Sequence, residues 1–304
     1  MRREKRHMFY GRTILVKYIV FLAGILILNL FCVSQYATAS RTSDRYFGAL
    51  QNRLIKDGFD KDRITALYKR PEVNFEIKGV SRFLVHREAE LNYDQFVSKK
   101  SIRNAIKYMK HHKEALEKTE KTYGVDKEII TAIILVETRF GALVGGPLVL
   151  NTLSTTAALA DTDVREIFWN KVSKSIRLTR KQFNRWVKRK SDWAYSELRA
   201  FLKYTAGEHL DPTEISGSYS GAMGIAQFMP SNILLFAKDG DNNGSINLFD
   251  HSDAISSIGN FLKHYGWYPG IKGKKAYQVI YHYNHSRQYV DTILKVSAIL
   301  KSKT

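Results

Sequence analysis

Apolar residues recur at helical spacing along most of the chain. One face of an α-helix has this period, because positions three, four and seven apart lie on the same side. Within residues 45–115 two runs show the spacing: Tyr46, Leu50, Leu54 and Ile55, then Ile102, Ile106 and Met109. Residues 164–205 are basic and have the same period. The pattern therefore predicts a mainly α fold.

Local signals predict where these helices begin and end. Arg70-Pro71 predicts an interruption, because the residue before a proline disfavours the helical conformation. Asp126 is a suitable N-cap for a helix over Lys127–Val136. Strand signals are weak, and residues 74–86 are the best candidate for a short strand.

The N-terminus has the pattern of an export signal. Residues 1–17 are rich in Lys and Arg, an apolar run follows at 18–33, and Ala37-Thr38-Ala39 comes next. This order predicts a signal peptide that is cleaved after Ala39. An uncleaved membrane anchor is the alternative, because the run approaches the length of a spanning helix. The single cysteine, Cys32, lies inside the run. The mature chain would then have none, which fits an exported, periplasmic protein.

The chain is expected to have three regions. Residues 1–39 are the signal peptide or anchor. Residues 40–119 are expected to form an N-terminal helical region that packs on the core. Residues 120–304 are expected to form the core itself, with a basic insertion near 160–185.

The charge favours an acidic partner. The formal net charge is +19, which suits nucleic acid, anionic lipid or an anionic polymer such as cell wall. Residues 168–191 contain nine Lys or Arg, no acid, and interleaved aromatic residues. By itself this stretch fits a nucleic-acid patch, and a solvated helix face explains it equally well. In an exported protein we expect attraction to the wall or to a membrane surface, and no nucleic acid.

Glu137 follows an almost wholly apolar run, residues 129–136, which predicts a buried helix. Ile130, Ile133 and Glu137 share one face of that helix. Burial disfavours the charged form of a carboxyl group and raises its pKa. An acid that protonates a glycosidic oxygen near neutral pH needs such a pKa. A structural ion pair, for example with Arg139, is the alternative.

Residues 216–230 are rich in glycine and small side chains, which let a ligand or a second helix approach the backbone closely. Ser218 and Gln227 offer hydrogen-bonding groups to a sugar, and Met223 and Phe228 offer apolar surface to its ring. The stretch has no carboxylate and no histidine. It therefore suits binding, and tight helix packing through its glycines explains the pattern equally well.

Three motifs together resemble the membrane-bound lytic transglycosylase B family. They are Glu-Thr-Arg-Phe-Gly at 137–141, Ser-Tyr-Ser-Gly-Ala-Met-Gly-Ile-Ala-Gln-Phe-Met-Pro at 218–230, and Tyr-Asn-His-Ser at 283–286. The resemblance implies a lysozyme-like, mainly α catalytic core. It also implies cleavage of the β-1,4 bond between N-acetylmuramic acid and N-acetylglucosamine in peptidoglycan, with 1,6-anhydromuramoyl ends as products.

The resemblance also implies roles for single residues. Glu137 matches the catalytic glutamate, and Ser218 and Gln227 match residues that line the sugar site. Tyr283 and Tyr289 match two aromatic residues of the groove. The basic pair Arg189 and Lys190 matches two arginines near the substrate. The insertion near 160–185 departs from the family pattern and makes the position of the basic pair uncertain.

The motifs offer one carboxylate, whereas most glycosidases use two. This predicts a substrate-assisted reaction in which Glu137 is first the acid and then the base. The acetamido group of the substrate would stabilise the cationic sugar, and the muramoyl 6-hydroxyl would attack the anomeric carbon. A hydrolytic muramidase and a non-catalytic wall-binding scaffold are the alternatives.

Residues 239–250 resemble an EF-hand loop and predict a structural calcium site. Oxygen ligands alternate along such a loop, with glycine at its sixth position. Here Gly244 is sixth, and Asp250 stands where the final glutamate is expected. In the resembling family the loop is slightly longer, so Asp253 is the alternative last ligand. The expected ligands are Asp239, Asp241, Asn243, Ser245 and either Asp250 or Asp253.

Overall fold

The computed structural model describes residues 45–86 and 92–303. These residues are mainly helical, as predicted, and their only β-structure consists of isolated bridges near residues 148, 216–217, 223 and 228. The predicted signal peptide or anchor, 1–39, lies outside the described residues. Within them, no helix is both long enough and apolar enough to cross a bilayer.

The described residues divide between Asn74 and Phe75 into two compact units. In the first, a helix covers residues 45–56 and α2 spans Lys61–Tyr68. Helix α2 ends just before Arg70-Pro71, as predicted. The rings of Phe47 and Tyr68 meet edge to face at 5.3 Å and are fully buried. The predicted boundary at 119/120, between an N-terminal helical region and the core, stays a prediction.

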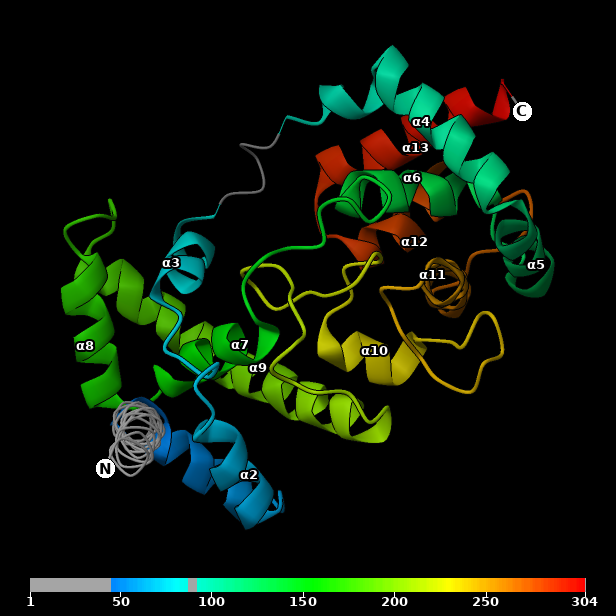
Figure 1. Ribbon diagram of the computed structural model, residues 1–304. Helices are drawn as coiled ribbons and strands as arrows, with labels where there is room; N and C mark the ends of the chain where they lie inside the picture. Colours follow the sequence, from blue (N-terminus) through cyan, green and yellow to red (C-terminus); the bar gives the residue numbers. More distant parts are fainter. Residues whose placement is uncertain (1–44, 87–91, 304) are drawn as a thin grey trace, which may run out of the picture. The chain divides into compact units, whose positions relative to one another are not determined.

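The second unit contains twelve helical elements among its described residues (Figure 1). They are α3 (Ile77–Val85), η2 (Asp94–Val97), α4 (Lys99–His111), α5 (Lys113–Tyr123), α6 (Lys127–Thr138), α7 (Val149–Ala158), α8 (Thr162–Val172), α9 (Arg180–Gly207), α10 (Pro230–Phe236), α11 (His251–His264), α12 (Gly273–Tyr283) and α13 (Arg287–Lys301).

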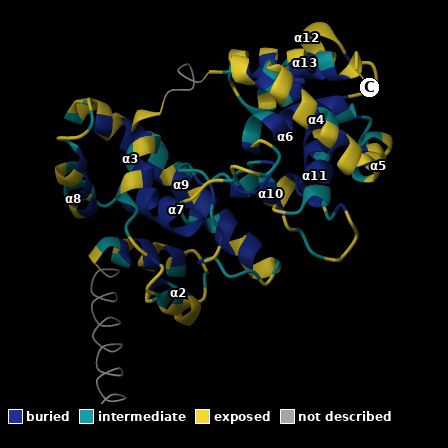
Figure 2. Ribbon diagram, turned by 45° about the horizontal axis from the view of Figure 1, so that its top comes forward, coloured by how far each residue is buried: buried dark blue, intermediate teal, exposed yellow. Residues whose placement is uncertain are grey.

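Two apolar helices organise this unit. Helix α6 is buried along most of its length and packs against α4, α5, α11 and α13. Every residue of α7 is buried, and α7 packs against α9 and α3. Helix α10 contacts both α9 and α11 and so joins the two groups. Figure 2 shows the buried residues concentrated along α6, α7 and α9.

The predicted strand at 74–86 is wrong, because residues 77–85 form α3. Its β-branched residues suggested a strand, but tertiary contacts override such a preference. The Glu76 side chain caps the helix by accepting the Gly79 N–H at 2.7 Å. The Glu76 N–H donates to the Thr155 hydroxyl at 2.8 Å, which fastens the start of α3 to α7.

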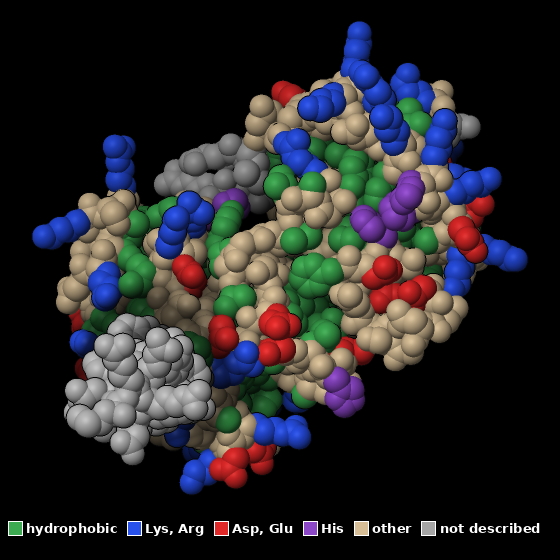
Figure 3. Space-filling view, viewed as in Figure 1, with side chains coloured by type: hydrophobic (Ala, Val, Ile, Leu, Met, Phe, Trp, Pro, Cys, Tyr) green, Lys and Arg blue, Asp and Glu red, His purple; other side chains and the backbone are tan. Residues whose placement is uncertain are grey.

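The predicted basic helical stretch, 164–205, is two helices separated by residues 173–179. Thr179 and Gln182 form a reciprocal capping box at the start of α9. Phe183 and Trp186 are buried, so this part of α9 turns its aromatic side chains inward and its cations outward. Basic side chains also project from the region of α4, as Figure 3 shows. The positive charge is therefore spread beyond the insertion.

The glycine-rich segment packs so closely that its glycines leave no room for a side chain. Gly221 and Gly224 have φ angles of 94° and 73°, which favour glycine. A Cβ at Gly224 would lie 2.5 Å from the Leu248 Cβ, and one at Gly221 would lie 2.7 Å from Leu153. The segment is thus held against α7 and against the loop that precedes α11.

Candidate active site

Glu137 lies in the last turn of α6, one residue beyond the end predicted from the sequence. Three consecutive residues, 139–141, then have positive φ angles and reverse the chain. The buried Thr138 hydroxyl donates to the Ile225 carbonyl at 3.0 Å and accepts the Gly141 N–H at 3.0 Å. These bonds fix the end of α6 against the glycine-rich segment and so fix the position of the Glu137 carboxyl group.

Tyr289, near the start of α13, donates its hydroxyl to Glu137 Oε1 at 2.7 Å. The side chain is buried, because α13 packs along α6. Burial, and then the charge of Glu137, raise the pKa of Tyr289 well above its usual value. The phenol therefore stays protonated and acts only as a donor to the carboxyl group.

Tyr283, at the end of α12, donates its hydroxyl to the Ala226 carbonyl at 2.5 Å. Its ring lies almost parallel to that of Tyr289, with centroids 6.3 Å apart. Burial raises the pKa of Tyr283 well above its usual value, and the charge of Glu137 adds to this. The two tyrosines thus join the α12–α13 turn both to the acid and to the glycine-rich segment.

A cavity of about 510 Å³ opens over Glu137. Its walls come from five segments: the end of α3, residues 93–96, the end of α6, residues 218–227 and the α12–α13 turn. A second cavity of about 500 Å³ shares Leu143, Ser218, Tyr219 and Gln227 with the first. The shared lining makes the two cavities one groove, which continues to Lys78 and Arg82 on α3.

Ser218 and Gln227 lie in this groove, together with Glu137, Tyr283 and Tyr289. The Ser218 hydroxyl accepts the N–H groups of Ser220 at 3.3 Å and Ala222 at 3.0 Å. Gln227 donates its amide to the carbonyls of Val144 and Gly224. Its Oε1 has no partner among the described residues. Both side chains shape the segment, and Gln227 keeps an acceptor for a ligand.

Met223 does not line the groove, contrary to expectation. The residue is fully buried, and its backbone bridges to Gly217 and Phe228. Its side chain therefore belongs to the core. Phe228 is also buried, with 2% of its surface exposed.

Arg189 is exposed on α9 and is not among the groove-lining residues. Successive residues of a helix point in different directions, so its neighbour Lys190 does not share the exposed direction of Arg189. The Lys190 ammonium lies 4.3 Å from the ring centroid of Trp193 and 5.0 Å from that of Phe83, which lines the groove. Burial, and then the charge of Arg189, lower the pKa of Lys190.

One wall of the groove was missed by the sequence reasoning, namely the wall formed by residues 83–86 and 93–96. There Phe83, His86, Tyr93, Gln95 and Phe96 line the cavity. The His86 ring and the Tyr219 hydroxyl share a hydrogen bond of 2.8 Å across it. Arg139 hydrogen-bonds Gln95 and lies over the ring of Phe96. The sequence signal that could have indicated this wall is the group of aromatic residues Phe83, Tyr93 and Phe96 in a stretch with weak helical periodicity.

The predicted calcium loop brings three carboxylates together. Oxygens of Asp239, Asp241 and Asp253 all lie within 4.8 Å of one another. Asp253 is fully buried and accepts the N–H groups of Gly240 and Asn247, both at 2.7 Å. Burial raises the pKa of Asp253. These three carboxylates could hold a metal ion, and oxygen ligands of this kind suit calcium.

Asp250 has a different role from the one its loop position suggested. It is the N-cap of α11, and its Oδ1 accepts the N–H groups of Ser252 and Asp253. Asp253 rather than Asp250 joins the acidic group. Asn243 and Ser245 lie in the loop. The Asn243 N–H donates to the Asp239 and Asp241 carboxylates, and the Ser245 N–H donates to the Asn243 side-chain oxygen. Glu208, which the sequence reasoning missed, accepts from Ser245 and Ile246.

Residues 42–276 match the family model of the transglycosylase SLT domain. The chain belongs to this family. The membership inferred from the three motifs is thereby confirmed. Among the family's relatives, the membrane-bound lytic murein transglycosylase B of Escherichia coli (strain K12) is 33% identical over 176 residues. The matched region is 58% of this chain and 41% of that protein, so it spans less than half of the relative's length.

Solved structures show the same fold. The Escherichia coli lytic transglycosylase Slt35, in complex with calcium, has a TM-score of 0.66 and 23% identity, covering 87% of this chain and 93% of that chain. SltB3 from Pseudomonas aeruginosa, in complex with NAG-NAM-pentapeptide, has a TM-score of 0.67 and 17% identity, covering 86% and 80%. The helical core of this SLT-domain protein is thus a lytic transglycosylase fold.

Proposed function

We propose that this protein is a lytic transglycosylase that cleaves peptidoglycan strands, with Glu137 as its only acid and base. The observation that carries the proposal is one half-buried carboxyl group, bonded to a buried tyrosine, in a long groove. Among the described residues, no other Asp or Glu lines the cavity over it. Glu76 lines the second cavity, where its carboxylate caps α3 by accepting the Gly79 N–H. Membership of the family and the name of the Escherichia coli relative support the same activity.

The reaction needs Glu137 to give one proton to the substrate and later to take one back from it. Glu137 gives its proton to the bridging oxygen as the bond from that oxygen to the muramoyl anomeric carbon breaks. The acetamido carbonyl of the muramoyl sugar stabilises the resulting cation. The carboxylate then takes the proton of the muramoyl 6-hydroxyl, whose oxygen forms the new bond to the anomeric carbon. Glu137 ends protonated, and no water is consumed.

Tyr289 is the positioning residue in this scheme. Its hydroxyl holds Oε1 of Glu137, so we assign the transferred proton to Oε2. Fixing the carboxyl plane in advance lowers the cost of reaching the reactive geometry. The bond favours the carboxylate over the acid, because a donor stabilises the charged form. It therefore assists most at the stage where Glu137 has given its proton away.

The groove suits a glycan that extends on both sides of the acid. Gln227 Oε1 is an acceptor for an acetamido N–H, and the ring of Tyr283 is flat surface near Glu137. Lys78 and Arg82, at the far end, would face carboxylates of the stem peptides. Lys190, on the ring of Phe83, is the basic residue of the predicted pair that lies nearest the groove.

The residues of the acidic loop fit calcium. Asp239, Asp241 and Asp253 would hold the ion, with Asn243 and Ser245 as further oxygen ligands. The ion would neutralise three neighbouring carboxylates and keep residues 239–253 closed. Its role would be structural, because no groove-lining residue belongs to this loop.

We place this protein in the periplasm, at the cell wall. The predicted export signal and the name of the membrane-bound relative support this location, and association with a membrane through the N-terminus is part of the proposal.

The products of digestion test the activity. The purified full chain, incubated with isolated peptidoglycan sacculi and calcium, should release muropeptides with anhydromuramoyl ends, identified by mass spectrometry. Reducing muramic acid ends instead would show hydrolysis, and the single-carboxylate mechanism would be wrong. Intact sacculi with folded, bound protein would support the scaffold alternative.

The variant Tyr289→Phe should turn over about 10- to 100-fold more slowly, because a hydrogen bond to a charged group contributes about 1.5–3 kcal/mol. KM should change little, since the hydroxyl bonds Glu137. The alkaline limb of the pH–rate profile, along which Glu137 loses its proton, should move to higher pH.

Tyr123→Phe is the matched control, because that hydroxyl contacts Ser256 away from the groove. Initial rates on sacculi across the pH range provide the measurement. A uniform loss of rate with an unchanged pH profile would mean that Tyr289 only supports the fold.

A further inference from the structure

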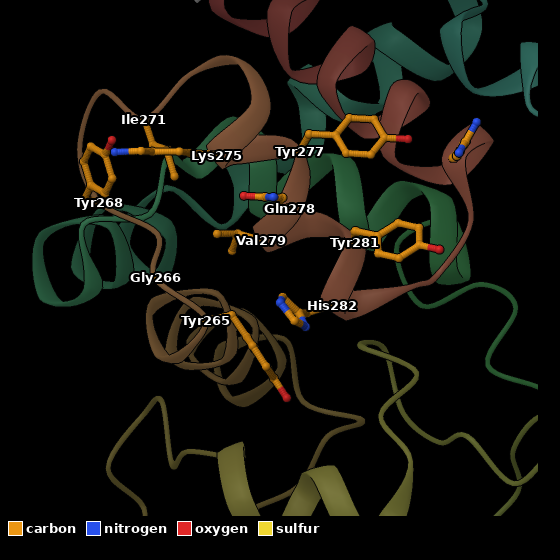
Figure 4. Close-up of a pocket in the computed structure, with 11 residues that line it drawn as sticks. Tyr265, Gly266, Tyr268, Ile271, Lys275, Tyr277, Gln278, Val279, Tyr281 and His282 are labelled. Carbon is orange, nitrogen blue, oxygen red and sulfur yellow. The ribbon is translucent and has the colours of Figure 1, made fainter.

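A separate cavity of about 540 Å³ lies at the α11–α12 connection and along α12. Its walls are the end of α11, the α11–α12 connection, α12 and the first residue of α13. It shares no lining residue with the groove. Figure 4 shows Tyr277 and Tyr281 projecting from one side of α12 and Lys275 from the other, with Gln278 and Val279 between them.

Aromatic rings form much of this cavity. Tyr277 and Tyr281 stand one helical turn apart with ring planes 17° from parallel and centroids 6.4 Å apart. Tyr265, at the end of α11, stacks on His282 at 4.3 Å. Tyr268, on the connection, is 43% exposed. Flat apolar faces such as those of Tyr277 and Tyr281 are surfaces on which sugar rings stack through their C–H faces.

The hydroxyl groups of these tyrosines, Tyr265, Tyr268, Tyr277 and Tyr281, form no hydrogen bonds to residues that the structure describes. Tyr283 and Tyr289 differ, because each donates to a protein oxygen. The cavity therefore combines stacking surfaces with polar groups that remain available to hydroxyl and amide groups of a ligand.

The charge of the cavity selects an anion. Lys275 and Arg287 line it, and neither has an ion-pair partner in the part of the chain that the structure describes. No carboxylate is among the lining residues. Two unpaired cations beside tyrosines match a sugar polymer that carries carboxylates.

We infer that this cavity is a second binding site for peptidoglycan, specific for an acidic, peptide-bearing amino-sugar segment outside the catalytic groove. The inference rests on the proposed function, which supplies a polymer of this chemistry. Both sites are built on the same turn. Residues 281, 282 and 287 face the second cavity, and residues 283, 284 and 289 face the groove. A strand held at the second site would keep the enzyme on the wall between cleavage events.

The test separates binding at this site from catalysis. In a Glu137→Gln background, which leaves sacculi uncut, Tyr277→Ala/Tyr281→Ala should weaken binding to sacculi at least about 10-fold, because truncated tyrosines cost binding steeply. Lys275→Gln/Arg287→Gln should weaken binding as well and reduce its dependence on salt. Lys272→Gln/Lys274→Gln is the matched control, since both lysines are exposed nearby and line neither site.

Cleavage of a soluble peptide-free tetrasaccharide with wild-type Glu137 checks that each variant is folded, because this probe fills only the groove. Second-site variants should cleave it like the wild type and cleave sacculi more slowly. The wild-type chain should bind sacculi stripped of stem peptides more weakly than intact sacculi, because Lys275 and Arg287 then have no carboxylates to bind.

Unchanged binding and cleavage of sacculi by both double variants would overturn the second site and leave the proposed function intact. Loss of tetrasaccharide cleavage in the aromatic variant would assign Tyr277 and Tyr281 to the fold; the charge variant, whose side chains are exposed, then decides the question. A wild-type chain that releases no glycan products would instead refute the proposed function.

Discussion

Glu137→Gln should reduce the release of muropeptides from sacculi by about 1,000-fold or more, because it removes the only proton donor and acceptor assigned to the reaction. The amide has nearly the same shape, and its oxygen still accepts the Tyr289 hydroxyl, so the fold and the affinity for sacculi should be kept. Release of soluble anhydromuramoyl products, followed by chromatography and mass spectrometry, measures the effect.

Glu114→Gln is the matched control for this variant. The residue is exposed on α5, and the substitution removes the same charge from a surface away from the groove. It should cleave at the wild-type rate. Residual cleavage by Glu137→Gln within about 10-fold of the wild type would mean that another group supplies the proton, since general acid–base catalysis is worth more than that.

Calcium should raise the unfolding temperature by about 5–10 °C at a free concentration near 100 times its Kd. At that ratio binding stabilises the folded state by about 2.7 kcal/mol, and each kcal/mol corresponds to about 2–4 °C for a domain of this size. Scanning calorimetry of the full chain with calcium, with chelator and with magnesium measures the shift. Magnesium should give the smaller shift, because it demands a tighter, octahedral site.

The pair Asp253→Asn and Asp250→Asn identifies the last ligand. Asp253→Asn should abolish the calcium-dependent shift and destabilise the protein by itself, since the fully buried carboxylate holds two backbone N–H groups. Asp250→Asn should keep most of the shift, because asparagine is an equally good N-cap. Loss of the calcium response in Asp250→Asn alone would assign the ion to the twelve-residue loop predicted from the EF-hand pattern.

The acid and the groove loop were predictable because the signals were local. The apolar run before Glu137 predicts a buried helix whose end is the site, and small residues at 216–230 predict close approach. The direction of single side chains was not predictable. Met223 points into the core because its backbone forms β-bridges to both Gly217 and Phe228. Arg189 and Lys190 are neighbours on α9, and only their different directions around the helix axis bring Lys190 near the groove and leave Arg189 away from it.

Contacts between distant segments explain the remaining errors. Residues 77–85 form a helix because Glu76 is tied to Thr155, seventy-nine positions away. The wall formed by residues 83–86 and 93–96 belongs to the groove through His86 and Tyr219, which are separated by 133 positions. Neither pairing has a local signature.

The bond between Glu137 and Tyr289 also sets an order of events during synthesis. The two residues are 152 positions apart, and the chain emerges from its N-terminus. Helix α6 is therefore made long before α13, and the acid exists without its partner until α13 has been made and packed. A chain cut before residue 289 would keep all three carboxylates of the calcium loop and the glycine-rich segment, yet hold an unpositioned acid. The proposed cleavage would therefore reach its full rate only once the last described helix, α13, has folded.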